Sequence, residues 1–437
     1  MTERLPLLEG GSATSPKDFL AASAHAGLHP EGKSDVAVLY SETPCTCAGV
    51  FTQNRVKGWP VVYNESVLSE RPGRLRGVVM NSQIANALTG PQGLDGAKQM
   101  AEAAETALEV PSRSVLVLST GMLGEALPLS KVLPAVTKAA EKVHPDGGAD
   151  AAKALMTTDR ISKHAAVRFE AANGPVTIGG IAKGSTMVHP KLATVLGIIT
   201  TDAKVEVQQL GHLLQTVCDR TFNAITVDGH SSPNDTVLLM ANGSSEIDVA
   251  RDADAWATFQ AAVLQVAEEL ALSIVRDGSK TNRFLEITVT GAPTETAARG
   301  VGRSIGSNAL VKTSFGAGRI EWGLIFAAVG DSGVPVDPER MALNVQVRSP
   351  KGGPAGEWVV VAKGGESSNP SPADLEKILE SRDIAMKLDL GMGGAAATVW
   401  TNDSVNVRLS KGGQKKTVKK SKATKTSKKT VSKKKQT

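Results

Sequence analysis

A small residue and a β-hydroxy residue stand side by side where a polar, glycine-bearing loop runs into an apolar segment. They are Ala193 and Thr194, and the apolar run 195–199 is typical of a buried strand. If the peptide bond between them breaks, Thr194 becomes an amino terminus. Its hydroxyl is then a nucleophile, and its own α-amine, with a free pKa of about 7.7–8.0, is the base. On spacing alone the plainer interpretation is stronger: Thr194 opens a strand, and Lys183 lies on a solvated loop.

A second loop with glycines follows the short apolar run 114–118, and it contains Thr120, Gly121 and Gly124. A loop of this kind directly after a strand can aim backbone N–H groups at an oxygen atom of a ligand, as in the oxyanion hole of an acyl-transfer site. The alternative is a strand followed by a turn whose glycines supply positive φ angles. On the residues alone this structural interpretation is again the stronger one.

Four stretches of the chain together resemble one enzyme family. Residues 183–196 read Lys-Gly-Ser-Thr-Met-Val-His-Pro-Lys-Leu-Ala-Thr-Val-Leu. This is similar to the signature Lys-Gly-Ser-Gly-Met-Ile-x-Pro-x-Met-Ala-Thr-Met-Leu of the ornithine acetyltransferases, also called glutamate N-acetyltransferases. Residues 81–90, 119–124 and 221–236 resemble further segments of that family, the last being the longest and most specific match. The resemblance covers most of residues 15–403.

The resemblance implies a chain that cuts itself before Thr194 and then uses this residue as the nucleophile. Members of the family move an acetyl group from N-acetyl-L-ornithine to L-glutamate through an acetyl-enzyme, in arginine biosynthesis. The family's oxyanion hole falls on Thr120 and Gly121, and its substrate-contacting residues fall on Thr157, Lys183 and Thr194. Lys183 would orient a substrate carboxylate. No cofactor is implied, and the sequence leaves open whether acetyl-CoA is a second acetyl donor.

Three stretches depart from the family pattern, and they alter the part of the pocket that would hold the substrate amine. Ser279 stands where relatives have a glutamate that contacts substrate, and residues 319–324 and 405–410 also differ from the corresponding family segments. We keep Ser279 as a substrate-binding candidate. The departures leave two alternatives to an acetyltransferase. One is an N-terminal-threonine amidase or aminopeptidase with water as the acceptor, and the other is a noncatalytic paralogue that kept the scaffold.

Composition predicts a globular protein with a basic appendage and without a membrane span. The 437 residues are 41% hydrophobic and 21% charged and contain no run of 18 apolar residues. The first residues lack a basic region followed by an apolar core, so we expect no signal peptide. The formal net charge is +5, but residues 411–437 contain 12 lysines and no acidic residue, which leaves −7 on the rest. This tail cannot bury enough apolar surface to fold. It would bind polyanions weakly and without specificity.

The cysteines indicate a reducing compartment. Cys45, Cys47 and Cys218 cannot all pair with one another, and the Cys-x-Cys spacing is poor for a bridge within one chain. Neither the cysteines nor the scattered histidines have the spacing of a zinc site. We therefore expect a cytoplasmic protein, with no metal implied.

Apolar strands alternate with amphipathic helices along the chain, which predicts an α/β fold with sheets covered by helices. We divide the chain into a loose lead over 1–14, an N-terminal lobe over 15–193, a C-terminal lobe over 194–410 and a disordered tail over 411–437. The family resemblance places the active site between the two lobes. It also implies an assembly of two alpha and two beta chains, formed by cleavage at the lobe boundary.

Overall fold

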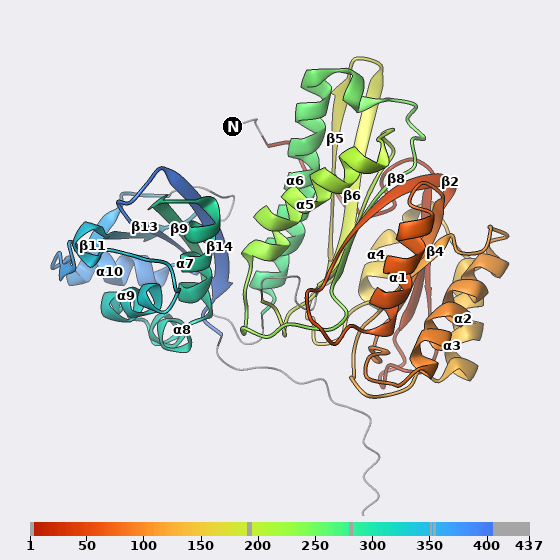
Figure 1. Cartoon of the computed structure of the whole chain (residues 1–437), viewed down its shortest axis with the longest axis horizontal. Coiled ribbons are helices and arrows are strands. Elements are labelled where there is room, and N and C mark those ends of the chain that lie inside the picture. The colour runs from red at the N-terminus through yellow and green to blue at the C-terminus, as the bar shows by residue number, and fades with distance from the viewer. Residues whose placement is uncertain (1–3, 190–194, 279–282, 350–351, 353–354, 405–437) are drawn as a thin grey trace, which may run out of the picture.

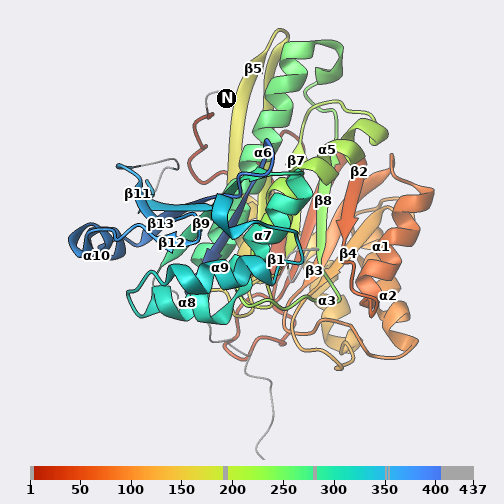
Figure 2. The same cartoon turned by 60° about the vertical axis from the view of Figure 1, so that its left-hand side comes forward.

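The computed structural model describes residues 4–189, 195–278, 283–349, 352 and 355–404, and these form two bodies. Figure 1 shows the larger body, coloured red to green, and the smaller body, built from the cyan and blue elements. Each body has its own sheet with helices packed on it (Figures 1 and 2). The predicted class, α/β with sheets covered by helices in two lobes, is therefore confirmed.

Among the described residues, the larger body is organised by an eight-stranded sheet of order β4-β3-β2-β8-β7-β6-β5, with β1 paired to β2. Its strands are β1 (Phe19–Ala24), β2 (Val36–Phe51), β3 (Leu75–Asn81), β4 (Val115–Ser119), β5 (Lys163–Ala171), β6 (Gly174–Lys183), β7 (Leu196–Thr201) and β8 (Thr236–Ala241). The pairs β3–β4 and β7–β8 are parallel, and the other neighbours are antiparallel.

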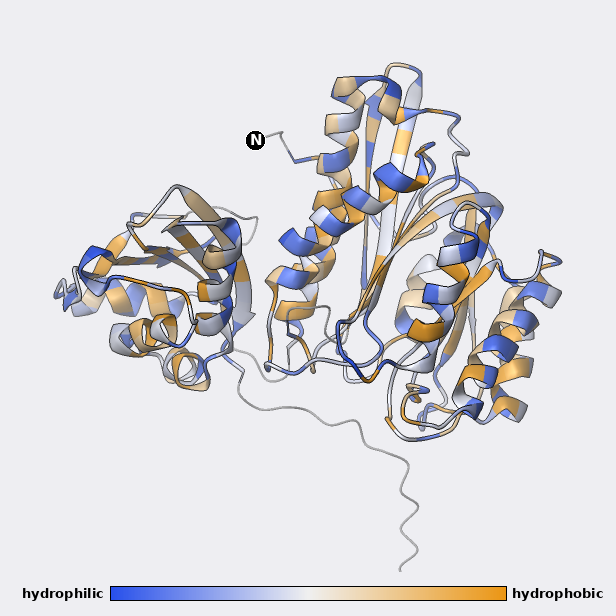
Figure 3. Cartoon of the chain, viewed as in Figure 1, coloured by the Kyte–Doolittle hydropathy of each residue, from blue (hydrophilic) through white to orange (hydrophobic). Residues whose placement is uncertain are grey.

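Helices cover both faces of this sheet. They are α1 (Trp59–Glu70), α2 (Gln92–Ala107), α3 (Leu129–Ala140), α4 (Gly148–Ala154), α5 (Val207–Arg220) and α6 (Ala253–Arg276), with the short turns η1 (Pro145–Gly147), η2 (Phe222–Ala224) and η3 (Val249–Arg251). Helices α1 to α4 share one apolar core with the sheet, and α5 and α6 share the other. Figure 3 shows hydrophobic and hydrophilic residues together around α2 and α3, as expected where one side meets the sheet and the other meets solvent.

The apolar run after Thr194 reflects burial on both faces of the sheet. In β7, Leu196 and Ile198 belong to the first core, whereas Ile199 belongs to the second. A strand covered on both faces needs apolar side chains at successive positions instead of alternate ones. This is why the run 195–199 correctly predicts a strand.

The smaller body contains a second sheet, of order β12-β11-β10-β13-β9-β14 in the described residues. Its strands are β9 (Phe284–Ala292), β10 (Ala342–Val347), β11 (Val359–Lys363), β12 (Glu366–Ser367), β13 (Asp383–Asp389) and β14 (Ala395–Asn402). Its helices are α7 (Glu295–Ser307), α8 (Ala309–Gly316), α9 (Trp322–Gly330) and α10 (Pro372–Glu380), with the turn η4 (Pro338–Arg340). These elements enclose a separate apolar core that includes Ile287, Val301 and Phe315.

The two bodies do not coincide with the predicted lobes 15–193 and 194–410. Strand β6 pairs with β7, so that Lys183 lies opposite Leu196, and β8 pairs with β2. Residues on both sides of position 194 therefore build one sheet, and within it β7 and β8 are covered by apolar residues on both faces. The smaller body begins at β9, after α6.

Helix α6 has the length and composition of a membrane-crossing helix, the one such helix in the part of the chain that the structure describes. It packs on β5 and β6, and 61% of its most apolar stretch is buried. A core helix of a large globular body has the same properties, so the helix carries no separate indication of a membrane.

Candidate active site

Lys183, the last residue of β6, links two of the other predicted site residues. Its side chain is 2% exposed. Its Nζ atom donates hydrogen bonds to the Thr120 hydroxyl at 3.2 Å and to the Thr157 hydroxyl at 3.0 Å. Thr120 directly follows β4, and Thr157 follows α4. Three residues that lie far apart in the sequence therefore meet around one ammonium group.

A buried chain of alternating charges holds Lys183 in place. The Asp159 carboxylate lies 3.9 Å from Lys183 Nζ, accepts the Gly184 N–H at 2.8 Å and accepts a hydrogen bond from Lys163 Nζ at 2.7 Å. Lys163 Nζ also donates to Asp277 at 2.7 Å. The Lys163, Asp159 and Asp277 side chains are at most 1% exposed. Each buried charge therefore has an opposite charge nearby, as buried ions require.

Burial and these partners shift two pKa values. Burial lowers the pKa of the Lys183 ammonium group, and Asp159 acts in the opposite direction. Burial alone would raise the pKa of Asp159, but the Lys183 and Lys163 ammonium groups outweigh it and lower that pKa to about 2. The carboxylate is thus ionised at any ordinary pH, which favours the charged form of Lys183.

The low pKa of Asp159 predicts a loss of stability in acid. The Asp159 carboxyl has a pKa near 3.8 in the unfolded chain and about 2 in the folded protein. Its contribution to the free energy of unfolding is therefore present above pH 4 and is lost as pH falls to 2. The loss is about 2 kcal/mol. Urea denaturation at a series of pH values should show this component in the wild type and in Asp150→Asn, an exposed control, but not in Asp159→Asn. An equal acid loss in Asp159→Asn would contradict this assignment.

The loop after β4 contains the Thr120 hydroxyl and the Gly121 N–H, the two donors that the family resemblance assigns to an oxyanion hole. The Thr120 N–H donates to the Asn81 carbonyl at 3.0 Å. The Thr120 hydroxyl oxygen accepts a hydrogen bond from Lys183, which leaves the hydroxyl proton as the donor that this residue can offer to a ligand. Gly121 has a φ of +131°, a region that favours glycine. A Cβ atom there would lie 2.0 Å from the Gln83 carbonyl carbon. The backbone therefore requires glycine at this position, which satisfies both the oxyanion-hole and the turn interpretation.

Gly121→Ala should separate the two interpretations of this loop. The new methyl group must displace the Gln83 backbone and move the Gly121 N–H. If the loop is the oxyanion hole that the resemblance implies, kcat should fall by about 10²–10³, the usual loss when one oxyanion donor is removed. Gly124→Ala is the matched control, because Gly124 also has positive φ, at +79°, but open space around it. Equal activities of the two variants would support a simple turn.

Two aspartates of the best-matched segment fix the chain on either side of residues 190–194. Asp228 accepts the N–H groups of Met187 at 2.6 Å and Val188 at 3.0 Å. The fully buried Asp235 accepts the N–H of Val195 at 3.0 Å. The segment 221–236 thus has a positioning role that its sequence alone does not reveal.

The structure brings Thr120, Gly121, Thr157 and Lys183 into one region, and the interpretation of Lys183 as a solvated loop residue is wrong. The other candidates, Ala193, Thr194 and Ser279, lie outside the described residues. The sequence does not single out Asp159, the charged partner of Lys183, or Lys163 and Asp277, which continue the network beyond it. Asp159 and Asp277 stand inside family-like segments, but Asp277 is 114 residues from Lys163, so only the fold reveals the network.

Comparison with known proteins shows the family to which the chain belongs. The chain matches the model of the ArgJ family over residues 20–406. It is 39% identical over 399 residues to the arginine biosynthesis bifunctional protein ArgJ of Symbiobacterium thermophilum, a match that covers 90% of this chain and 95% of that protein. It is 36% identical over 389 residues to the protein of the same name from Thermotoga neapolitana, with 89% and 96% covered. A solved ornithine acetyltransferase in complex with ornithine, from Mycobacterium tuberculosis, is 38% identical, and the match covers 44% of this chain and 100% of that chain with a TM-score of 0.40. On the family model and the curated relatives, the chain belongs to the ArgJ family.

Proposed function

We propose that the protein is a self-processing acetyltransferase that moves an acetyl group from N-acetyl-L-ornithine to L-glutamate in arginine biosynthesis. The observation that carries the proposal is the buried Lys183 ammonium group, which donates to the Thr120 and Thr157 hydroxyls. Lys183 lies opposite Leu196, two residues after Thr194. Kinship with arginine-biosynthesis bifunctional proteins supports the pathway, and the acetyl donor and acceptor follow from the family resemblance of the sequence.

The first step is cleavage of the chain. The Thr194 hydroxyl adds to the Ala193 carbonyl carbon, the C–N bond breaks, and an ester between Ala193 and the Thr194 oxygen forms while the nitrogen becomes a free amine. Water hydrolyses the ester and leaves chains of residues 1–193 and 194–437. The fixed N–H groups of Val188 and Val195, on either side of this segment, support such a local rearrangement because the surrounding strands need not move.

The second step is transfer of acetyl to Thr194. The Thr194 hydroxyl attacks the acetyl carbonyl of N-acetyl-L-ornithine, and its α-amine takes the hydroxyl proton. The Thr120 hydroxyl and the Gly121 N–H stabilise the resulting oxyanion. When the intermediate collapses, the proton passes to the leaving nitrogen and L-ornithine departs. Lys183 keeps the Thr120 hydroxyl oriented, because its ammonium group can only donate and the hydroxyl proton is left to face the substrate.

The third step returns acetyl to an amino acid. The L-glutamate amine attacks the acetyl-Thr194 ester and releases N-acetyl-L-glutamate and the free hydroxyl. Thr157 and Ser279 contribute to substrate binding, with Lys183 near the substrate carboxylate.

We also propose a cytoplasmic assembly of two alpha and two beta chains. Acetyl-CoA as a second donor would give the same acetyl-Thr194 ester.

Product analysis tests the proposed reaction. Purified protein is incubated with N-acetyl-L-ornithine, with and without L-glutamate, and the products are separated by liquid chromatography and mass spectrometry. We expect N-acetyl-L-glutamate only when glutamate is present, at a rate that Thr194→Ala abolishes. Free acetate formed equally with and without glutamate would instead support an amidase with water as the acceptor. The absence of any product would support a noncatalytic protein.

A further inference from the structure

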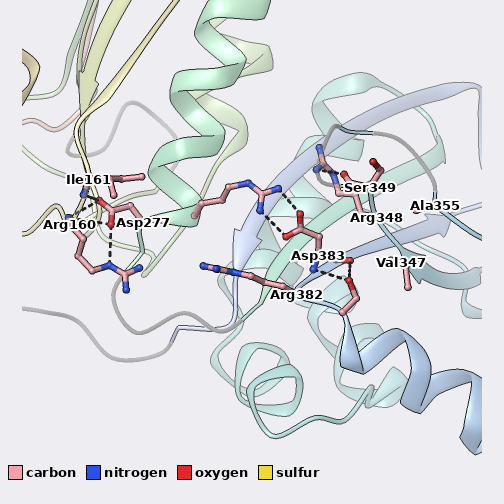
Figure 4. A pocket seen from close by; sticks show the side chains of 11 residues that line it. Arg160, Ile161, Asp277, Val347, Arg348, Ser349, Ala355, Arg382 and Asp383 are labelled. Atoms are coloured by element: carbon pink, nitrogen blue, oxygen red, sulfur yellow. Dashed lines mark hydrogen bonds and ion pairs between the residues drawn. The ribbon is translucent and has the colours of Figure 1, made fainter. Parts of the chain in front are cut away.

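A second site is visible where the two bodies face each other. A cavity of about 760 Å³ lies between the end of α6 and the sheet of the smaller body. Figure 4 shows Arg160, Ile161 and Asp277 on one side and Arg348, Arg382 and Asp383 on the other. A volume of this size suits a small-molecule ligand. The residues that line the cavity do not include Thr120, Thr157 or Lys183. The cavity lies beside the proposed catalytic cluster, and the two share only Asp277, the outer member of the charged network.

Positive charge exceeds negative charge in this cavity. Arg160, Arg276, Arg348 and Arg382 line it, against Asp277 and Asp383. Arg276 forms a two-pronged ion pair with Asp383, at 2.8 and 2.7 Å, which joins the larger body to the smaller one. Arg348 pairs with Glu286 at 2.7 Å. These two arginines are therefore neutralised by their partners.

The other two arginines are not fully neutralised. Arg160 pairs with Asp277 at 3.1 Å, but the same carboxylate also accepts from the buried Lys163 at 2.7 Å. One negative charge thus serves two cations. Among the residues that the structure describes, no hydrogen bond or ion pair holds the guanidinium group of Arg382. Figure 4 shows its side chain extending toward Arg160 and Asp277, with no interaction drawn to it.

We propose that this cavity binds a small molecule carrying several oxyanion charges, through the guanidinium groups of Arg382 and Arg160. Guanidinium groups present a planar fork of donors that matches phosphate and carboxylate oxygens. A ligand with charges at both ends would contact Arg160 of the larger body and Arg382 of the smaller one together. Because these arginines belong to different bodies, the ligand would add to the contact that Arg276 and Asp383 already make.

Calorimetric titration of the full chain tests the proposal, with inorganic pyrophosphate and citrate as separate probes at low ionic strength. The two probes distinguish phosphate from carboxylate as the source of the charge. We expect at least one probe to bind the wild type, with affinity reduced about tenfold in Arg382→Gln and in Arg160→Gln, as expected for loss of one charge-assisted contact. Arg382→Gln should fold normally because no partner within the described residues is lost.

Arg251→Gln is the matched control. Arg251 is 81% exposed and is not among the residues that line the cavity, so its removal changes the net charge by the same amount without touching the site. The lysine-rich tail is present in every variant, and its nonspecific binding contributes equally to all of them. No binding of either probe, or equal binding by the wild type and both cavity variants, would overturn the proposal.

Discussion

Thr194→Ala should yield one uncut chain of 45.4 kDa that transfers no acetyl group. Alanine lacks the hydroxyl that is proposed to attack the Ala193 carbonyl, so neither the break nor the new amine can form. It also lacks the hydroxyl that is proposed to carry the acetyl group. We expect transfer to fall by roughly 10³-fold or more, as for the loss of other covalent nucleophiles. Intact-mass measurement and product analysis check the two effects separately.

Thr194→Ser is the control for this variant. Serine keeps a hydroxyl at the same position, so it should still cut the chain into residues 1–193 and 194–437 and retain measurable transfer. An uncut wild-type chain that nonetheless moves acetyl groups would end the self-processing proposal. A chain that is cut in Thr194→Ala would show that another group, or a protease, breaks it.

Asp159→Ala should destabilise the larger body more than any other single change in the charged network. It leaves the Lys183 and Lys163 ammonium groups without the carboxylate between them, both almost fully buried. Breaking a buried pair in this way costs about 3–5 kcal/mol. Urea denaturation measures the change in the free energy of unfolding. The Thr194→Ala background is the best host, since a single chain is expected to unfold there.

The double variant Asp159→Ala/Lys163→Met provides the control for this effect. In Asp159→Ala, Lys163 keeps only Asp277 as a partner. Replacing Lys163 as well removes one of the two cations that lost Asp159 and leaves Asp277 paired with Arg160, so the double variant should lose roughly 1–3 kcal/mol less than the sum of the two single changes. Strict additivity would mean that the two groups do not interact in the folded protein, in contradiction to the 2.7 Å contact.

The sequence predicts most of the fold where local pattern and burial agree. The amphipathic pattern over 207–220 gives α5 with the bounds that the structure has. The sequence does not predict helix α1, because its apolar residues do not gather on one face. It does not predict α7 either, because that helix contains Gly300, Gly302 and Gly306, and glycine is a poor helix former. Serine followed by proline favours a capped helix start at Ser371, and α10 does begin at Pro372, but the Ser371 side chain makes no capping hydrogen bond.

The candidate site was only partly accessible from the sequence. Thr120, Thr157 and Lys183 came from the family resemblance, because Thr120 is 63 residues and Thr157 26 residues from Lys183 and no local pattern links them. Residues 35–40 and 48–56 illustrate the same limit. Local pattern favours a strand in the first segment and a strand followed by a turn in the second, but 36–40 and 48–51 belong to one strand, β2, of 16 residues. The length of a strand and the residues that meet at a site depend on segments distant in the chain. A single sequence does not identify which distant segments pair.

The placement of β7 and β8 determines whether the chain folds before or after the bond preceding Thr194 is cleaved. Both strands lie in the middle of the larger sheet, between β2 and β6 of the preceding segment. If the bond before Thr194 opens, the two products stay interleaved, and neither has a complete sheet by itself. Maturation must then follow folding, and separately synthesised fragments should not reconstitute the enzyme by simple mixing.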